Sequence, residues 1–475
     1  MGMKSGGDEL GSGRMTADGG AAGDRGALDQ AGDQASMMPA GRVSLAEALA
    51  ARERAGKPVK VGVIGCGQMG TDLFVQIAQM QGIEIVAACD MRPERIEAAC
   101  KMSGDRCRPL EIVGGGNLSQ AIGRGRLAAA NDPEVVCRTP EVEVVIDATG
   151  NPNAGAAVAL ATIGAAKHIV MMNVEADVTI GAYLAAEARR KGVVYTLGAG
   201  DEPSSAMELV RFVQALGYPI VASGKGKNNP FRIDAIPDDY RAEAERRNMN
   251  PRMLVEFVDG SKTMVEMVAI ANATGLTPDI PGMHGPAAPR EELQNYFCPK
   301  EEGGLLSKKG VVDFSVAKGV APGVFVVAEM RHPRVRERMS DLHLGPGPYY
   351  SFFRPYHLTS LEVPLSAAAA VIVGESHMQP LSVPSAEVGC VAKRDLKPGE
   401  TLDAIGEYCY RGFALTRADA LAKGALPLGL AQGAKVTRAI AKGDLLTLAS
   451  VVPDASSRIY AARRAQDEMI TAARR

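Results

Sequence analysis

The sequence predicts an α/β protein with a doubly wound parallel sheet, an α+β domain and a small C-terminal all-β domain. Three observations lead to this prediction. A glycine-rich loop, Gly65–Gly70, follows a β-rich run and opens a helical pattern. Further β-rich runs alternate with helical runs up to about residue 204. From Ala386 onward, short β-rich runs alternate with Pro-Gly and Lys-Gly turns.

The glycine loop carries the dinucleotide-binding pattern of a Rossmann fold. It follows the expected strand Val59–Ile64, and a second strand follows the helix. The first glycine allows a tight turn, the second lets the backbone approach a pyrophosphate, and the third permits close helix–strand packing. The helix N-terminus then offers N–H groups to the phosphates. The expected cofactor-binding residues are Gly65, Gly67, Gln68, Met69, Gly70, Asp90, Arg92, Ala148, Thr149 and Gly150.

The end of the second strand leaves the choice between NAD and NADP open. Asp90 can accept hydrogen bonds from the ribose hydroxyls of NAD, and its charge repels a 2′-phosphate. Arg92 can instead pair with the 2′-phosphate of NADP. We expect NAD to be accepted at least as well as NADP. The segment Asp147–Gly150 (DATG) ends a later strand, at the sheet edge where ligands bind in such folds.

The domain boundaries follow from changes in composition. Residues 1–42 contain few large apolar side chains and are expected to be a disordered tail. Residues 43–204 form the nucleotide-binding domain, closed by a strand at Val193–Leu197. Residues 205–380 form the catalytic or substrate domain, with a strand at Met253–Val258 and part of residues 345–380 returning to the first domain. Residues 385–475 form the β domain and a terminal helix.

Composition excludes several classes of partner. The chain has 475 residues, a formal net charge of −2 and 46% hydrophobic residues, which is ordinary globular usage. The small net charge predicts neither nucleic acid nor a membrane surface as partner. No apolar run reaches the ~18 residues that a membrane span needs. We expect a cytoplasmic homo-oligomer with a small-molecule substrate.

Several blocks of the chain resemble one protein family, the 1-deoxy-D-xylulose-5-phosphate reductoisomerase-like proteins, which are related to homoserine dehydrogenase. The resemblance extends from about Ser44 to the C-terminus, and the last two blocks are similar to the SAF module, a small β-clip. These blocks are Met171–Gly181 (MMNVEADVTIG), Leu197–Glu208 (LGAGDEPSSAME), Gly224–Pro230 (GKGKNNP), Asp259–Gly275 (DGSKTMVEMVAIANATG), Val391–Leu402 (VAKRDLKPGETL) and Ile440–Leu446 (IAKGDLL).

The resemblance implies a reductoisomerase of isoprenoid biosynthesis, which rearranges 1-deoxy-D-xylulose 5-phosphate and reduces it to 2-C-methyl-D-erythritol 4-phosphate. Such chemistry needs polarised vicinal oxygens, a proton acceptor and cations for the phosphate. Lys225 and Lys227 are the candidate cations. Asp201 and Glu202 are the candidates for acid–base catalysis or for binding a divalent metal ion. Asn173, at a strand end, is the candidate for orienting the substrate or the nicotinamide.

Each candidate has a structural alternative. The two lysines can be solvated loop residues, and Asp201 with Glu202 can cap the helix that follows. Lys262 and Glu266 have the spacing of a surface ion pair on a helix. His284 and His357 are interpreted as packed or capping histidines.

Two other functions stay open from the sequence. One is an NAD-dependent oxidoisomerase or dehydrogenase of a sugar acid such as apionate, in carbohydrate catabolism. The other is a non-catalytic protein that binds a dinucleotide or a carbohydrate. Competition by phosphate distinguishes the reductoisomerase from the sugar-acid enzyme, and turnover distinguishes both from a binding protein.

Overall fold

A computed structural model describes residues 44–114, 117–247 and 249–473. The predicted disordered tail, residues 1–42, lies outside the described residues. From Leu45 onward the described residues form one compact unit. Among them, no helix is both long and apolar enough to cross a membrane.

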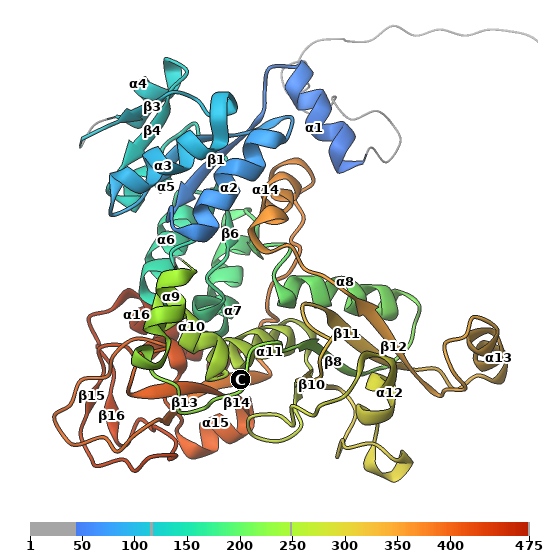
Figure 1. The fold of residues 1–475 in the computed structure, drawn as a ribbon. Helices are drawn as coiled ribbons and strands as arrows, with labels where there is room; N and C mark the ends of the chain where they lie inside the picture. The colour runs from blue at the N-terminus through green and yellow to red at the C-terminus, as the bar shows by residue number, and fades with distance from the viewer. Residues whose placement is uncertain (1–43, 115–116, 248, 474–475) are drawn as a thin grey trace, which may run out of the picture. The chain divides into compact units, whose positions relative to one another are not determined.

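A seven-stranded parallel sheet dominates the first part of the chain, and it confirms the predicted α/β fold (Figure 1). Its strand order is β3-β4-β2-β1-β5-β6-β7, so the order reverses beside β1, as in a doubly wound sheet. The interior strands are buried on both faces. The strands are β1 (Val59–Ile64), β2 (Ile83–Cys89), β3 (Leu110–Ile112), β4 (Leu127–Ala130), β5 (Val144–Asp147), β6 (His168–Met171) and β7 (Tyr195–Leu197).

Helices connect these strands and cover the sheet. A later helix, α14 (Val363–Ile372), also packs on β1, β5 and β6, and its residues Val363, Ala367 and Ala368 belong to the same apolar cluster as the sheet. Residues 363–372, which lie within the predicted second domain, thus pack on the first sheet. The helices of this part are α1 (Leu45–Arg54), α2 (Gln68–Gln79), α3 (Pro93–Ser103), α4 (Leu118–Gly123), α5 (Pro133–Arg138), α6 (Pro152–Gly164) and α7 (Val174–Lys191).

A second, mixed sheet of five strands follows α8 (Glu202–Ala215). Its order is β12-β11-β8-β10-β9, with β10 parallel to β8 and β9, and β11 antiparallel to β8 and β12. Its strands are β8 (Ile220–Gly226), β9 (Thr277–Pro278), β10 (Val311–Ser315), β11 (Val324–Glu329) and β12 (Tyr349–Arg354). The other helices of this part are α9 (Arg241–Arg246), α10 (Pro251–Val258), α11 (Ser261–Thr274), α12 (Leu293–Tyr296) and α13 (Pro333–Asp341).

The predicted strand at residues 253–258 is wrong, because this segment belongs to α10. Pro251 starts the helix, and the Asn250 side chain caps it by accepting a hydrogen bond of 3.0 Å from Arg252 N. Apolar residues at 254, 255 and 258 also have helical spacing, and all three are buried. The short apolar run fits the period of a strand as well as that of a helix. The helix forms because Asn250 and Pro251 start it.

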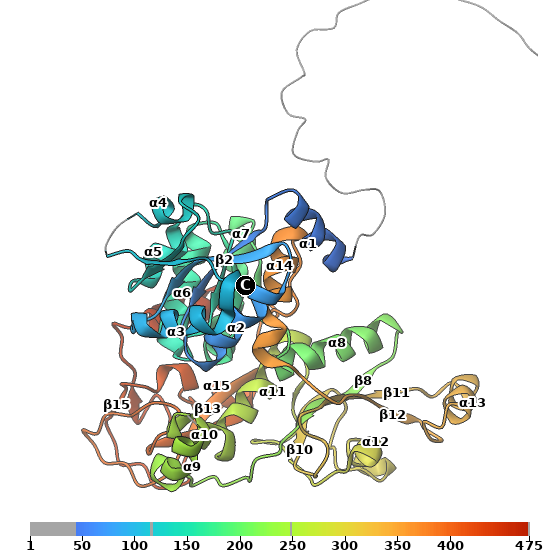
Figure 2. The same ribbon diagram turned by 45° about the horizontal axis from the view of Figure 1, so that its top comes forward.

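The C-terminal module, residues 385–475, contains two small antiparallel sheets and packs on α11. Strands β13 (Ala386–Ala392) and β14 (Tyr410–Thr416) pair over their full length, and β15 (Lys435–Val436) pairs with β16 (Val451–Val452). Figures 1 and 2 show α11 between β8 and this module. The helices of the module are α15 (Arg417–Lys423) and α16 (Arg458–Ala472), the latter packed on α6 and α7.

Candidate active site

The glycine loop joins β1 to α2 and has the shape that a dinucleotide needs. Gly65 has φ +92°, and a Cβ at this position would come within 2.7 Å of the Ala148 carbonyl oxygen. A Cβ on Gly70 would come within 2.0 Å of the Gly65 carbonyl oxygen. At Gly67 the same atom would meet nothing within 4 Å, and this residue gives α2 no side-chain cap. The open helix N-terminus fits a pyrophosphate.

Asp90 lies beside this loop, at the end of β2. Its Oδ2 accepts a hydrogen bond of 2.8 Å from Cys66 N, and its Oδ1 accepts one of 2.9 Å from Arg92 N. Arg95 Nη1 lies 3.9 Å from Asp90 Oδ2, whereas the Arg92 side chain is exposed. The carboxylate is therefore fixed at the loop, where an adenosine ribose would lie.

The loop after β5 is held in place by Asn173. The Asn173 Nδ2 donates to the Asn151 carbonyl at 2.8 Å and to Thr149 Oγ1 at 3.3 Å, and its Oδ1 accepts from Ala176 N at 3.1 Å to cap α7. The Asp147 Oδ1 accepts from Thr149 N at 3.1 Å. Asn173 thus bonds within the protein through both ends of its amide. In the structure it positions the loop that carries Ala148, Thr149 and Gly150.

The carboxyl end of β8 carries a lysine that is buried between two glutamates. Lys225 Nζ lies 2.5 Å from Glu202 Oε1 and also pairs with Glu266 Oε2. The three side chains are 8%, 13% and 2% exposed, in that order. Burial lowers the pKa of Lys225, but the two carboxylates outweigh this effect and hold it above its usual value. Lys225 is therefore an internal counter-ion and not a solvated loop lysine.

Asp201 completes a group of three carboxylates with Glu202 and Glu266. Their oxygens all lie within 4.8 Å of one another, a spacing and a donor set that fit Mg²⁺ or Mn²⁺. Asp201 stands at the N-cap position of α8, but its side chain makes no capping hydrogen bond and contacts Glu202 instead. Burial raises the pKa of Asp201 to about 8, since the charged form is poorly solvated there.

A second lysine lies next to this group, on the first turn of α11. Lys262 Nζ lies 3.2 Å from Glu175 Oε1, which comes from the first turn of α7. Burial lowers the pKa of Lys262, but Glu175 and Asp201 outweigh it and keep it well above its usual value. Glu266 is buried beside Lys225. Lys262 and Glu266 therefore do not form the surface pair that their spacing suggested.

Lys227 differs from the other two lysines. Its ammonium donates to the Phe257 carbonyl and lies 5.9 Å from the centroid of the Phe231 ring. Its side chain is buried, and within the described part of the chain no carboxylate forms an ion pair with it. Burial, together with the nearby charge of Lys225, lowers the pKa of Lys227 to about 8.

Sequence reasoning missed two members of the site. Glu266 was assigned to a surface pair, and His357 to the packed histidines. His357 Nδ1 lies 2.7 Å from the Pro322 carbonyl, and Nε2 lies 3.5 Å from Glu202 Oε2. The carbonyl can only accept, so Nδ1 carries the hydrogen and Nε2 faces the carboxylates. His284, in contrast, pairs with Asp279 at 2.8 Å.

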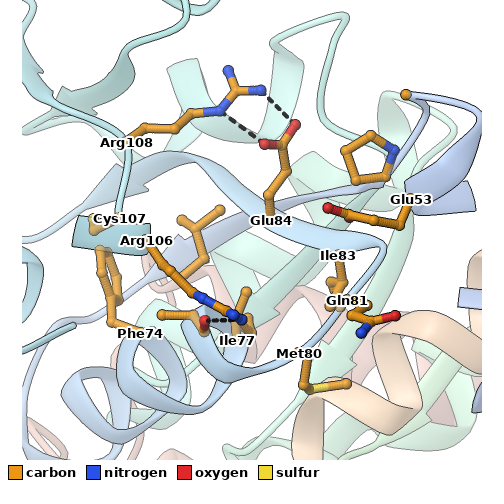
Figure 3. Close-up of a pocket in the computed structure, with 14 residues that line it drawn as sticks. Glu53, Phe74, Ile77, Met80, Gln81, Ile83, Glu84, Arg106, Cys107 and Arg108 are labelled. Atoms are coloured by element: carbon orange, nitrogen blue, oxygen red, sulfur yellow. Dashed lines mark hydrogen bonds and ion pairs between the residues drawn. The ribbon is translucent and has the colours of Figure 1, made fainter. Parts of the chain in front are cut away.

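A hollow beside the first sheet lies away from this site (Figure 3). Its volume is about 600 Å³, and its walls include the amino-terminal ends of β1 and β2 and the end of α2. Arg108 crosses it to Glu84 through hydrogen bonds of 2.9 and 2.5 Å. The glycine loop and Asp90 lie at the opposite, carboxyl-terminal edge of the same strands, so this hollow is not the cofactor site.

Comparisons with known proteins agree with the order of these parts. Residues 65–197 match the family described as homoserine dehydrogenase, NAD binding domain, and residues 200–363 match oxidoreductase DRL, catalytic domain. No curated protein matches the chain significantly.

Three solved structures have a distant similarity to the chain. A probable dehydrogenase from Thermotoga maritima is 15% identical with a TM-score of 0.39, over 67% of this chain and 90% of that one. A scyllo-inositol dehydrogenase from Lactobacillus casei with NAD(H) and scyllo-inositol is 15% identical with a TM-score of 0.33, over 57% and 74%. A DOX-P reductoisomerase in complex with magnesium is 16% identical with a TM-score of 0.32, over 44% and 56%.

The two family matches divide the chain where the structure does. The first covers the glycine loop and the parallel sheet, and the second begins at Gly200, immediately before Asp201 and Glu202, and ends at the start of α14. The protein therefore carries an NAD-binding Rossmann domain followed by the catalytic domain of an oxidoreductase, and we conclude that it is an NAD(P)-dependent oxidoreductase.

Proposed function

We propose that this oxidoreductase acts on a short, polyhydroxylated sugar bearing an anionic group, and that a reductoisomerase reaction of the 1-deoxy-D-xylulose 5-phosphate type is the leading candidate. One observation carries the proposal: a buried lysine and three carboxylates meet where α8, β8 and α11 converge. A rearrangement of vicinal carbonyl and hydroxyl groups needs such a set, because both oxygens must be held while protons move.

The roles follow from the contacts. Asp201, Glu202 and Glu266 would hold a divalent cation, which supplies Lewis-acid polarisation of the two substrate oxygens when it is bound. Lys225, from the strand between these carboxylates, donates hydrogen bonds at the same place. The Nε2 atom of His357 faces Glu202. There it could accept a proton from a substrate hydroxyl and later return it.

The dinucleotide fits the other side of the site. The glycine loop would hold its pyrophosphate, and the segment 148–150 would lie along the nicotinamide ribose. Asn173 keeps that segment in place. The bound dinucleotide would supply the hydride for reduction of the substrate carbonyl, and Glu266 and Lys225 would line a buried place for this step.

A sugar-acid oxidoisomerase is the second candidate, and Asp90 favours it. Its carboxylate is fixed beside the glycine loop, where it would bind the ribose hydroxyls of NAD. A preference for NAD is typical of catabolic oxidation, whereas the reductive reaction is NADPH-linked in the family that the sequence resembles.

The test is an assay of the purified protein with 1-deoxy-D-xylulose 5-phosphate and with apionate, each with both dinucleotides and with Mg²⁺ or Mn²⁺. We expect turnover of one of them, and a loss of about 10³-fold or more in kcat for Glu266→Gln. Glu53→Gln, at the distant hollow, is the matched control. Turnover of neither substrate class, or full activity of Glu266→Gln, would contradict the proposal.

A further inference from the structure

Arg411 is a cation without a carboxylate partner. It lies on β14 of the C-terminal module, and its guanidinium is 5.4 Å from the centroid of the Phe413 ring. The one hydrogen bond from its side chain is a long contact of 3.5 Å from Nη1 to the Gly412 carbonyl. In the described residues no acidic side chain forms an ion pair with it, although it is partly buried. Withdrawing a guanidinium from water without an acceptor is unfavourable.

Lys227 is in the same situation, although it comes from a different domain. It is more deeply buried than Arg411, and its ammonium has a neutral carbonyl as its partner. Within the described ranges, neither of these two cations forms an ion pair with a carboxylate, whereas Lys225 and Lys262 do.

Contacts with the start of α11 bring Lys227 and Arg411 to one place. Lys227 bonds to the last turn of α10, and the Phe231 ring beside it packs on Gly260, where an added Cβ would lie 2.4 Å from the ring. On the other side, Gly412 N donates to Ser261 Oγ at 2.8 Å. Gly260 and Ser261 are adjacent, so Phe231, beside Lys227, and Gly412, next to Arg411 in β14, flank the same turn. Asp259, directly before this turn, acts electrostatically on both Lys227 and Arg411.

The acidic residue of this turn, Asp259, already forms an ion pair. Asp259 Oδ2 lies 2.6 Å from Lys393 Nζ of the C-terminal module, and its Oδ1 accepts from Ser261 N at 2.8 Å. Both members of the Asp259–Lys393 pair are buried. This pair fixes the module against α11. The charge of Asp259 also acts on Lys227 and on Arg411, so one carboxylate faces three cations at this turn.

We propose that Lys227 and Arg411 together bind the anionic group of the substrate, a phosphate or a carboxylate, so that the C-terminal module contributes a residue to the active site. The inference rests on the proposed function for the rest of the substrate, whose oxygens would lie at Lys225 and Glu202. Lys227 follows Lys225 by two positions at the end of β8, so the anion and the reacting oxygens would be held by neighbouring side chains. A planar guanidinium binds two oxygens at once, and an ammonium adds a point charge.

The experiment is calorimetric titration of the full-length protein, saturated with NADH so that the pyrophosphate site is filled. The probes are inorganic phosphate and D-erythronate, a four-carbon sugar acid. Arg411→Gln and Lys227→Gln should each weaken binding by about tenfold. Arg411→Lys should keep part of the affinity, and Arg438→Gln, an exposed arginine of the same module, should bind as wild type.

The two probes distinguish the sources of the anion. Tighter binding of phosphate assigns a phosphorylated substrate, and tighter binding of erythronate assigns a sugar acid. Either result supports the proposal if Arg411→Gln and Lys227→Gln both bind the probe more weakly than the wild type does. Failure of the wild type to bind either probe, or wild-type affinity in Arg411→Gln, would overturn it. Because no turnover is measured, an error in the proposed reaction would leave this result unchanged.

Discussion

Two positions along one helix, α11, hold buried lysines in opposite ways. At Glu266, in the middle of α11, Lys225 is enclosed by two carboxylates of the protein. At the start of α11, Lys227 contacts a backbone carbonyl and an aromatic ring. The two lysines are separated by one glycine in the sequence. The difference shows that a buried cation can be stabilised by the fold itself or left for a ligand to stabilise.

The pKa values of the two lysines express this difference. The carboxylates hold the pKa of Lys225 above its usual value despite burial. Burial lowers the pKa of Lys227 to about 8 and the charge of Lys225 adds to this effect, which Glu266 and Asp259 oppose only in part. We therefore expect variants of Lys225 to affect folding and variants of Lys227 to affect ligand binding.

The largest expected effect is on stability. Lys225→Met leaves Glu202 and Glu266 buried without their cation, and should lower the free energy of unfolding by about 3–5 kcal/mol. Lys227→Met removes a buried charge that has no carboxylate partner, and should change it by less than about 1 kcal/mol. Urea denaturation of the two variants measures both values. Equal losses would show that the middle and the start of α11 do not differ in how they hold a lysine.

The next effect is on catalytic efficiency. Lys227→Gln and Arg411→Gln should each lower kcat/KM for the sugar substrate by about tenfold or more, since charge-assisted contacts contribute ~1.5–3 kcal/mol. The loss should appear mainly in KM, and the affinity for the dinucleotide should not change. Wild-type kinetics in both variants would show that the two cations do not bind the substrate and have a structural role.

The dependence of anion binding on pH should follow Lys227. As pH rises through about 8, Lys227 loses its proton, so the affinity for sulfate should fall several-fold between pH 7 and pH 9.5. Sulfate is the probe because it does not titrate in this range. Lys227→Arg stays charged and should bind sulfate equally well at both pH values. An equal fall in this variant would assign the titration to another group.

The same shift affects stability with the opposite sign. The unfolded lysine binds its proton up to about pH 10.5, whereas the folded one loses it near pH 8. The folded state therefore binds fewer protons between these values, and the contribution of Lys227 to stability rises with pH across this window. Denaturation of wild type and Lys227→Met at pH 7 and pH 10 checks the sign.

The smallest effect is expected on sulfate affinity when the cofactor site is changed, which tests whether the start of α11 is independent of that site. Asp90→Ala should lower kcat/KM for NAD by about tenfold, while Arg92→Ala, at an exposed position, should change that for NADP by a few-fold at most. Neither should alter sulfate affinity. A strong preference of wild type for NADP, lost in Arg92→Ala and unaffected by Asp90→Ala, would favour the NADPH-linked reduction over an NAD-dependent oxidation.

The sequence alone determined the nucleotide-binding part, because its signals are local. The glycine loop, the strand before it and the acidic residue after it lie within one stretch from Val59 to Asp90, and the backbone contacts that they make are between neighbours in this unit. Alternating strands and helices also determined the parallel sheet. Where a short apolar run fitted two periods, at residues 253–258, the sequence did not decide correctly.

Only the tertiary structure decided how the charged residues are paired. Lys225, Glu202 and Glu266 come from a strand and two helices, and Lys262 pairs with Glu175 rather than with the glutamate four residues along its own helix. Gly412, next to Arg411 in β14, contacts Ser261 at the start of α11 across 151 residues of chain. The spacing of residues along the sequence predicts which side chains can meet on one helix or strand. Which of them are buried together depends on how distant elements pack, and burial sets their charge.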